Sequence, residues 1–349
     1  MTAVSVRDVA QRAGVSVGTV SNVMNHPDKV SPATVRRVQA AIDALGFIRN
    51  DAARQLRDGR STTIGMIVLD VRNPFFTDVA RGAEDKAAAA GLTVTLGNSD
   101  ENTTRESNYL DLFEQQRVHG VLISPYADIT PRLHRLRSRG IPAVLVDRPS
   151  SDHSFSSVSV DDVAGGRMAV EHLVSQGRRR IAFVGGPMGI RQVTDRLEGA
   201  KHAVAINNDV SLDVIVLDAL SVLEGRRAGT RLLSLAPDQR PDAIFAANDL
   251  VAMGVLEALL MQGAGVAVPE EIALIGYDDI DFAAAAVVPL SSIRQPSALI
   301  GQTAVEILLD EAADPHLEAR QVVFQPELVV RASTRAGMPG RDWAASARP

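Results

Sequence analysis

The chain has 349 residues, 46% of them hydrophobic, which is enough for about two domains with well-filled cores. It contains no cysteine, and this excludes disulfides, thiolate metal sites and cysteine nucleophiles. The first 60 residues hold nine Lys and Arg against five Asp and Glu, whereas the remainder holds 27 against 37. A basic head on an acidic body indicates contact with a polyanion that is confined to the head.

The first residues carry charge where a secretory signal needs an apolar core. No apolar run approaches the roughly 18 residues that a membrane span requires. We therefore expect a cytoplasmic protein without membrane contact.

Three short helices are predicted in the head. Residues 6 to 13 place apolar side chains at the i, i+3, i+4, i+7 spacing of an amphipathic helix. After a glycine turn, Ser16 is suited to cap a second helix over residues 16 to 25. A third helix begins at Ser31, has proline at its first position, and stops at Gly46. This order predicts a helix-turn-helix unit, with a small bundle that has no nucleic-acid role as the alternative.

Residues 14 to 18, Gly-Val-Ser-Val-Gly, also fit the G-x-S-x-G pattern of a hydrolase nucleophile elbow. An elbow needs a buried strand before its serine, but the pattern before Ser16 is helical. We therefore expect Ser16 to be a helix cap near a phosphate, and we assign no catalytic residue.

The head resembles the DNA-binding domain of the lactose-repressor (LacI/GalR) family through the motifs D-V-A-x-x-A-G-V-S, T-V-S-x-V-x-N, V-S-x-x-T and N-x-x-A-x-x-L. The resemblance implies that the second helix enters the major groove, where residues 17, 18 and 22 face bases and residues 19, 21 and 25 hold the backbone. The DNA-binding residues that it implies are Ser16, Val17, Gly18, Thr19, Ser21, Asn22, Asn25, Ser31, Asn50, Ala53, Gln55 and Leu56.

The base-facing residues differ in what they offer to DNA. Asn22 is able to bond the edge of an adenine in bidentate fashion, a contact worth about 1–3 kcal/mol of discrimination. Gly18 has no side chain, and Val17 offers only apolar contact, for example to a thymine methyl. At these two positions the chain departs from family members that carry polar side chains.

A short capped helix and a linker are predicted over residues 49 to 61. By resemblance this is a hinge helix that orders on operator DNA and pairs with its twin in the minor groove. Leu56 would act there as a wedge that opens a base step. The alternative is a plain helical linker.

From residue 62 the pattern changes to strands that alternate with helices. Two series of four apolar runs each predict a parallel sheet covered on both faces. We expect an α/β fold with two doubly wound lobes and a ligand site in the cleft between them, at the carboxyl ends of the strands. The runs lie within residues 62 to 70, 92 to 98, 120 to 125, 142 to 147, 179 to 186, 213 to 219, 242 to 249 and 272 to 279.

The body resembles the periplasmic-binding-protein-like sugar sensor of the same family. The resemblance implies a helix-turn-helix domain over residues 1–48, a hinge over 49–61, a two-lobed effector-binding and dimerisation domain over 62–336, and a tail over 337–349. The expected lobes comprise residues 62–161 with 292–324, and residues 162–291 with 325–336.

Polar side chains and two phenylalanines follow the ends of the predicted strands. Carboxylates and amides bond hydroxyls, arginine bonds them bidentately, and a ring stacks on the apolar face of a sugar. Residue 220 is leucine where the family often has an aromatic residue. The residues expected to bind the effector are Asn73, Phe75, Phe76, Ser124, Asp147, Arg148, Arg196, Leu220, Asn248, Asp278 and Gln295.

Structural roles are the alternative for several of these strand-end residues. The charged ones could serve only to pair with one another, because a buried charge needs a partner. Asn73 could simply form a turn with the next proline. Of their neighbours, Asp249 is expected to cap a helix, and Asp279 could bind only backbone.

Together these features predict a sequence-specific transcription regulator, most often a repressor in this family, whose operator affinity is controlled by a sugar or sugar derivative. Its expected partners are a pseudo-palindromic operator, this small polar effector and a second copy of the chain, since two heads on one palindrome require two-fold symmetry. No metal or cofactor is expected, because the histidines lack ligand spacing. The alternative is a cytoplasmic sugar-binding or sugar-processing protein with a non-essential head.

Overall fold

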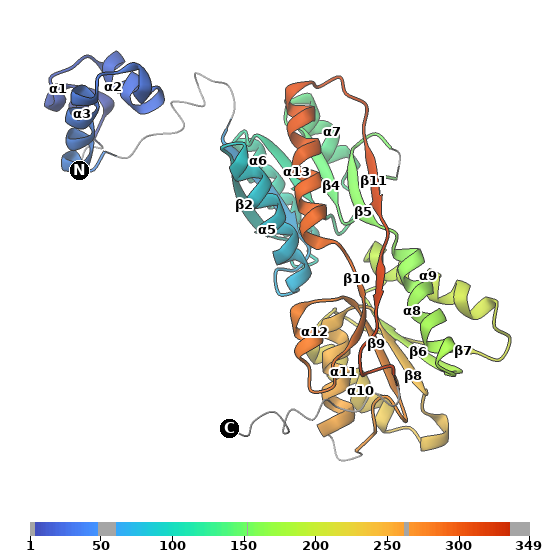
Figure 1. Cartoon of the computed structure of the whole chain (residues 1–349). Helices are drawn as coiled ribbons and strands as arrows, with labels where there is room; N and C mark the ends of the chain where they lie inside the picture. The colour runs from blue at the N-terminus through green and yellow to red at the C-terminus, as the bar shows by residue number, and fades with distance from the viewer. Residues whose placement is uncertain (1–3, 48–60, 152, 262–264, 336–349) are drawn as a thin grey trace, which may run out of the picture. The chain divides into compact units, whose positions relative to one another are not determined.

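The computed structural model describes residues 4–47, 61–151, 153–261 and 265–335, and the chain divides after Ser61 into two compact units (Figure 1). Most of the predicted hinge and the whole predicted tail lie outside the described residues. So do four of the predicted DNA-binding residues, which are Asn50, Ala53, Gln55 and Leu56.

The first unit is a bundle of three helices, as predicted. Serine hydroxyls cap each helix by accepting a backbone N–H, and glycines with φ near 60° end the first and third helices. Val9, Val20 and Val38 are fully buried between them. The elements are α1 Val6–Ala13, α2 Val17–Asn25, a 3-10 turn Pro27–Lys29 and α3 Pro32–Leu45.

The second unit consists of two lobes, each built on a six-stranded sheet (Figure 1). The first sheet is parallel throughout, with the order β11-β5-β4-β3-β1-β2. Its strands are β1 Thr63–Val68, β2 Thr93–Asn98, β3 Gly120–Ile123, β4 Ala143–Val146, β5 Ser157–Val160 and β11 Gln321–Phe324.

The second sheet has the order β12-β10-β9-β8-β6-β7, in which only β12 is antiparallel to its neighbour. Its strands are β6 Arg180–Gly185, β7 Ser211–Val216, β8 Ala243–Ala246, β9 Ala273–Asp278, β10 Ser291–Arg294 and β12 Glu327–Val329.

Helices cover both faces of each sheet, which is the expected doubly wound arrangement. In the first lobe, α5 and α13 pack over one face and α6 and α7 over the other; in the second, α8 with α9 and α10 with α11 do the same. The helices are α5 Pro74–Ala89, α6 Thr103–Gln115, α7 Thr130–Ser138, α8 Asp162–Ser175, α9 Arg191–Ala205, α10 Val222–Leu233, α11 Asp249–Met261, α12 Asp281–Ala285 and α13 Ser297–Ala313, with a 3-10 turn Pro237–Gln239.

Glycines allow paired helices to cross backbone against backbone. A Cβ on Gly82 of α5 would overlap the carbonyl of Ala298, and one on Gly301 of α13 would overlap the carbonyl of Val79. The pairs α8 with α9 and α10 with α11 contain reciprocal glycines of the same kind. The helix layers therefore tolerate no side chain at these crossings.

The chain passes between the lobes three times, after β5, after β10 and after β11. The expected return to the first lobe at residue 292 is wrong, because Ser292, Ile293 and Arg294 pair with β9 in the second sheet. The return begins only after Arg294. The apolar Ile293 continues the core of the second lobe, and this explains why the strand stays there.

Candidate functional site

Helix α2 presents an exposed face of small and polar residues. Val17 is 42% exposed, and Gly18 and Asn22 are also exposed, while Val20 and Val23 are buried against the other helices. A Cβ built on Gly18 would have a single neighbour within 4 Å, the Ser16 hydroxyl at 3.7 Å. The face therefore has room for longer side chains at the positions predicted to contact bases.

The remaining described positions of the predicted DNA surface stabilise helix ends or pair with each other. Ser16 Oγ accepts the Thr19 N–H at 3.0 Å, and Ser31 Oγ caps α3 in the same way. Asn25 Nδ2 donates to Ser21 Oγ at 3.2 Å. The element before Ser16 is the helix α1, so the structure has no nucleophile elbow there.

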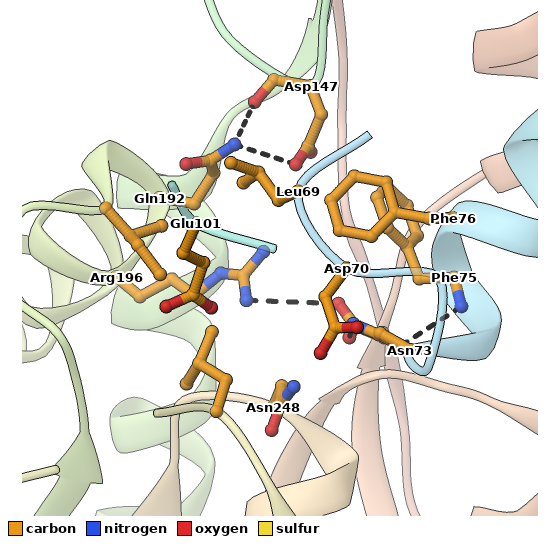
Figure 2. Close-up of a pocket in the computed structure, with 13 residues that line it drawn as sticks. Leu69, Asp70, Asn73, Phe75, Phe76, Glu101, Asp147, Gln192, Arg196 and Asn248 are labelled. Atoms are coloured by element: carbon orange, nitrogen blue, oxygen red, sulfur yellow. Dashed lines mark hydrogen bonds and ion pairs between the residues drawn. The ribbon is translucent and has the colours of Figure 1, made fainter. Parts of the chain in front are cut away.

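A cavity lies between the two lobes of the second unit (Figure 2). Eight of the eleven predicted effector residues line it, and the structure thus brings together groups that end or follow six separate strands. Their role in binding an effector stays a prediction. The eight are Asn73, Phe75, Phe76, Asp147, Arg196, Leu220, Asn248 and Asp278.

The other three predicted residues do not line this cavity. Arg148 Nη1 donates to the carbonyls of Pro125 and Ala127, and burial lowers the pKa of its guanidinium. Ser124 is buried beneath the surface. Gln295 acts through a neighbour, since its Nε2 donates to Asp278 Oδ1 at 2.7 Å.

Asp147 is a buried carboxyl of the first lobe that meets an amide of the second. Gln192 Nε2 donates to its carbonyl at 2.6 Å and to its Oδ2 at 2.7 Å. Its Oδ1 has no partner among the described residues. Burial, together with the negative charge of Asp162, raises the pKa of Asp147 well above its usual range. The backbone is left-handed at Asp147, with φ 60°, a strain that is common at functional sites.

Arg196 and Asp278 form the opposite wall. Arg196 Nε donates to Asp162 Oδ1 at 2.8 Å and its Nη1 donates to the carbonyl of Ala247 at 2.7 Å, while the guanidinium lies 3.6 Å from the centre of the Tyr277 ring. Arg196 Nη1 is 3.8 Å from Asp278 Oδ1. Charge pairing, the alternative that the sequence left open, thus occurs in the same wall that faces the cavity.

Asp278 also connects the two lobes. Its Oδ2 accepts Asn73 Nδ2 of the first lobe at 2.9 Å, and its φ of 102° lies far from ordinary side-chain-bearing conformations. Burial raises the pKa of Asp278 even though Arg196 lowers it. Asn73 is also the cap of α5, because its Oδ1 accepts the N–H of Phe75. The predicted turn is therefore present, while a role of Asn73 in binding an effector stays a prediction.

The open space in the cavity is about 30 Å³, roughly enough for two water molecules. Asn248 caps α11 through Oδ1, which accepts the N–H of Val251 at 2.9 Å, and its Nδ2 is buried without a partner among the described residues. The site therefore presents an unpaired acceptor on Asp147 and an unpaired donor on Asn248. Such atoms suit a ligand rich in hydroxyl groups.

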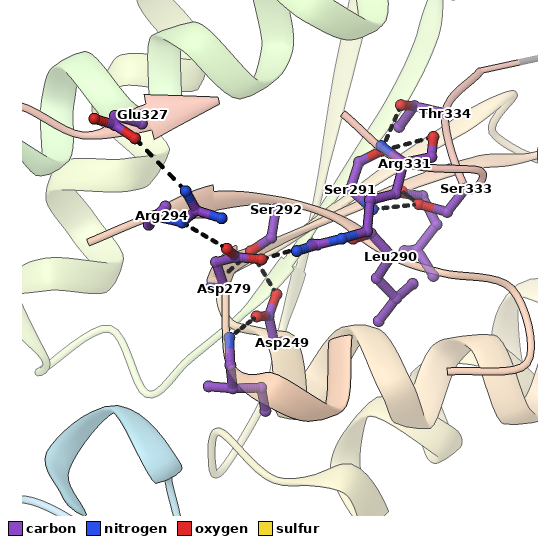
Figure 3. A network of polar contacts seen from close by, with 12 residues as sticks. Asp249, Asp279, Leu290, Ser291, Ser292, Arg294, Glu327, Arg331, Ser333 and Thr334 are labelled. Atoms are coloured by element: carbon purple, nitrogen blue, oxygen red, sulfur yellow. Dashed lines mark hydrogen bonds and ion pairs between the residues drawn. The ribbon is translucent and has the colours of Figure 1, made fainter. Parts of the chain in front are cut away.

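Asp249 and Asp279 belong to a separate network on the second lobe (Figure 3). Asp249 is not the helix cap that the sequence predicted; it accepts Ser292 Oγ at 2.7 Å and the N–H of Ile280 at 2.9 Å. Asp279 does not bond backbone alone, as the sequence allowed. Arg294 Nε and Arg331 Nη1 donate to its carboxylate at 2.8 and 2.6 Å. Both acids accept a hydrogen bond from a side chain of β10, Asp249 from Ser292 and Asp279 from Arg294.

Sequence reasoning missed five residues of the cavity. Asp70 and Glu101 follow the ends of β1 and β2, so the rule that predicted the other strand ends applies to them as well. Gln192 precedes Arg196 by four residues on α9, a spacing that places both on one helix face. The remaining two are apolar: Leu69 and Ile190.

The described ranges contain neither a candidate metal site nor a candidate membrane-spanning helix. No cluster of His, Cys, Asp or Glu there is arranged to hold a metal ion. Within the same ranges, every helix is too short or too polar to cross a membrane.

Two regions of the chain match known families. Residues 5–50 match the bacterial regulatory proteins of the lacI family, and residues 170–334 match the periplasmic binding protein-like domain. The HTH-type transcriptional repressor PurR of Photobacterium profundum is 34% identical over 338 residues, which cover 95% of this chain and 98% of that protein.

Solved structures agree with this similarity. The lac repressor dimer bound to operator and the anti-inducer ONPF gives a TM-score of 0.81 at 28% identity, with 96% of this chain and 100% of that chain covered. A LacI family transcriptional regulator from Enterococcus faecium with bound ribose gives 0.71 at 31% identity, covering 78% and 98%. Because the similarity to PurR extends over almost the whole of both chains, the protein belongs to the lacI family of bacterial regulatory proteins.

Proposed function

We propose that the protein is a repressor that binds a pseudo-palindromic operator as a homodimer, and that a sugar or sugar derivative bound between its lobes controls this affinity. The observation that carries the proposal is the cavity itself. It combines the unpaired Asp147 Oδ1 and Asn248 Nδ2 with the rings of Phe75 and Phe76, whose centres lie 5.0 Å apart. Unpaired polar atoms beside aromatic rings suit a ligand that has both hydroxyl groups and an apolar face.

Relatives support both halves of the proposal. The solved lac repressor dimer is bound to operator, and the Enterococcus faecium regulator holds ribose. In this chain, the operator is assigned to the exposed face of α2, with Asn22 as its hydrogen-bonding residue.

Control of DNA binding follows from linkage. The ligand contacts both lobes and therefore prefers one arrangement of them over the other. It changes operator affinity by the ratio of its own affinities for the two arrangements. A coupling of 1–3 kcal/mol corresponds to about a 5- to 150-fold change in operator affinity.

The test begins with the full-length chain and fragments of the source genome. Fragments retained by the purified protein identify an operator, and fluorescence anisotropy then measures its Kd with and without each of a broad panel of sugars. We expect at least one sugar to bind by calorimetry and to shift the operator Kd at least fivefold. Sequence-independent retention of fragments, or an operator Kd that no bound sugar changes, would contradict the proposal.

A further inference from the structure

The walls of the cleft carry an excess of negative charge. Its ionisable lining consists of four carboxyls, Asp70, Glu101, Asp147 and Asp278, and one guanidinium, Arg196. This guanidinium already has a countercharge, because Asp162 lies behind the wall at 2.8 Å from Arg196 Nε. A ligand that enters therefore meets a surface that is negative overall.

Two of the four carboxyls are satisfied by the protein. Arg72 Nε donates to both oxygens of Asp70, at 2.9 and 3.0 Å, and Asp278 accepts the amides of Asn73 and Gln295. In the part of the chain that the structure describes, neither Asp147 nor Glu101 forms an ion pair. Because burial raises the pKa of Asp147 well above its usual range, the negative charge without an ion pair that a ligand meets at pH 8 is that of Glu101.

Buried polar atoms give an independent sign that this surface receives a ligand. Asp147 is 3% exposed and Asn248 is 1% exposed, and both line the cavity. Asp147 Oδ1 and Asn248 Nδ2 have no hydrogen-bond partner among the described residues. Proteins leave buried polar atoms unpaired only rarely, and mainly where a ligand or water completes the bond.

Glu101 is placed at the cleft by its backbone. Asp100 and Glu101 both have left-handed φ values, 52° and 54°, and the N–H of Glu101 donates to the carbonyl of Leu69 at 3.2 Å. This turn fastens Glu101 to the end of β1, beside the other lining residues (Figure 2). Partial burial, reinforced by the charge of Asp70, raises the pKa of Glu101 to about 7. Near neutral pH, Glu101 is therefore present in both its neutral and its ionised form, and a charged group placed beside it changes their proportion.

We infer that the cleft selects against anions: its effector is an uncharged or amine-bearing polyhydroxylated compound, and Glu101 rejects the phosphorylated and carboxylated derivatives of that compound. The inference rests on the proposed function. A phosphate or carboxylate beside Glu101 would meet a like charge in a site of low dielectric, whereas a hydroxyl or an ammonium donates to Glu101 and to the unpaired Asp147 Oδ1. Arg196 does not offset this repulsion, since its charge is matched by Asp162.

The experiment compares matched ligands by calorimetry at pH 8 on the full-length chain. The panel contains D-ribose with ribose 5-phosphate, and D-glucose with glucosamine, glucose 6-phosphate and gluconate. We expect wild-type protein to bind the neutral or amine form of a sugar at least tenfold more tightly than its acidic form. In Glu101→Gln this ratio should fall at least threefold. Glu84→Gln, at an exposed position on α5, is the matched control and should keep the wild-type ratio.

A second measurement needs no variant. For glucose against gluconate, neither of which titrates between these pH values, wild-type protein should discriminate less at pH 6 than at pH 8, because Glu101 is largely protonated at the lower pH. Binding of an acidic form as tightly as its neutral counterpart at pH 8 would overturn the inference and leave the proposed function intact. The same ratio in wild type and Glu101→Gln, or the same ratio at both pH values, would remove Glu101 from the role. If no form of any sugar binds, the proposed function fails and the inference fails with it.

Discussion

At the scale of single residues, the cleft shows how a side chain serves both lobes at once. Asn73 caps α5 with its oxygen and donates its nitrogen to Asp278, while Gln192 reaches Asp147 from the other side. Glu101 stands apart because its carboxylate forms no ion pair with any of the described residues. The protonation of Glu101 should therefore be measurable through the pH dependence of stability.

Stability should depend on pH through Glu101. Its pKa is about 7 in the folded chain, against an ordinary 4.5, so the folded state holds a proton that the unfolded state releases. The stabilisation is present at pH 4.5 and is lost as pH rises to 7. Relative to Glu101→Gln, wild type should lose about 1–2 kcal/mol over this range, once screening of its partly exposed charge is allowed for. Chemical denaturation at four pH values measures this.

Burial is the main cause of the raised pKa of Glu101, and neighbouring charges adjust it. Asp70 and Asp100 raise the pKa of Glu101, and Arg72 lowers it. Arg72→Gln should therefore move the transition to higher pH. Parallel stability curves for wild type and Glu101→Gln would show that this carboxyl does not titrate as described.

Arg196→Ala and Asp278→Ala should impair the response to effector and leave operator binding intact. Each change removes a charged group from the cleft wall, and a hydrogen bond to such a group is worth about 1.5–3 kcal/mol, which is at least tenfold in affinity. Operator Kd with and without the bound sugar is the measurement. A folded variant that still responds at the wild-type sugar concentration would place the effector elsewhere, whereas loss of folding would favour a purely structural ion pair.

At the scale of elements, glycines decide how closely the helices approach. Gly301→Ala should destabilise the second unit by about 1–3 kcal/mol or more, because its methyl group would overlap the carbonyl of Val79. Gly18→Ala is the matched contrast, since its methyl group meets only the Ser16 hydroxyl at 3.7 Å. It should stabilise the first unit by up to about 1 kcal/mol. Thermal unfolding of the two variants gives both values, and an equal effect at the two glycines would refute the crossing argument.

Leu56→Ala should weaken operator binding far more than binding to random DNA. A wedge acts only where the duplex is kinked, while random DNA is held mainly by charge. Anisotropy titrations at one salt concentration compare the two duplexes. An equal loss of affinity for the two duplexes would contradict the wedge and favour the alternative, a plain helical linker.

Most elements could be predicted because their signals are local. The serine caps and glycine stops of α1 and α3 lie in the sequence itself, as do the apolar runs of the strands. The cap of α11 could not be assigned from Asn248-Asp249, since either side chain is able to cap and tertiary bonds to Ser292 and Ile280 occupy Asp249. Gln192 was missed for a related reason: only the approach of the two lobes gives it a partner.

At the scale of the whole molecule, we expect a homodimer. A pseudo-palindromic operator needs two heads related by two-fold symmetry. Light scattering of dilute protein without DNA should give the mass of two chains. A stable tetramer under these conditions would contradict this expectation.

The amide bridges across the cleft make ligand binding an exchange. If a hydroxyl of the proposed sugar bonds Asp147 Oδ2 in place of the Gln192 nitrogen, or Asp278 Oδ2 in place of the Asn73 nitrogen, binding opens an amide bridge between the lobes. In that case the bridges compete with the sugar, and its observed affinity is the intrinsic affinity multiplied by the fraction of molecules in which the bridges are open. We then expect a change at Gln192 that weakens its bridge to lower the sugar concentration at which operator affinity changes, and the Asn73 bridge to contribute to the same threshold.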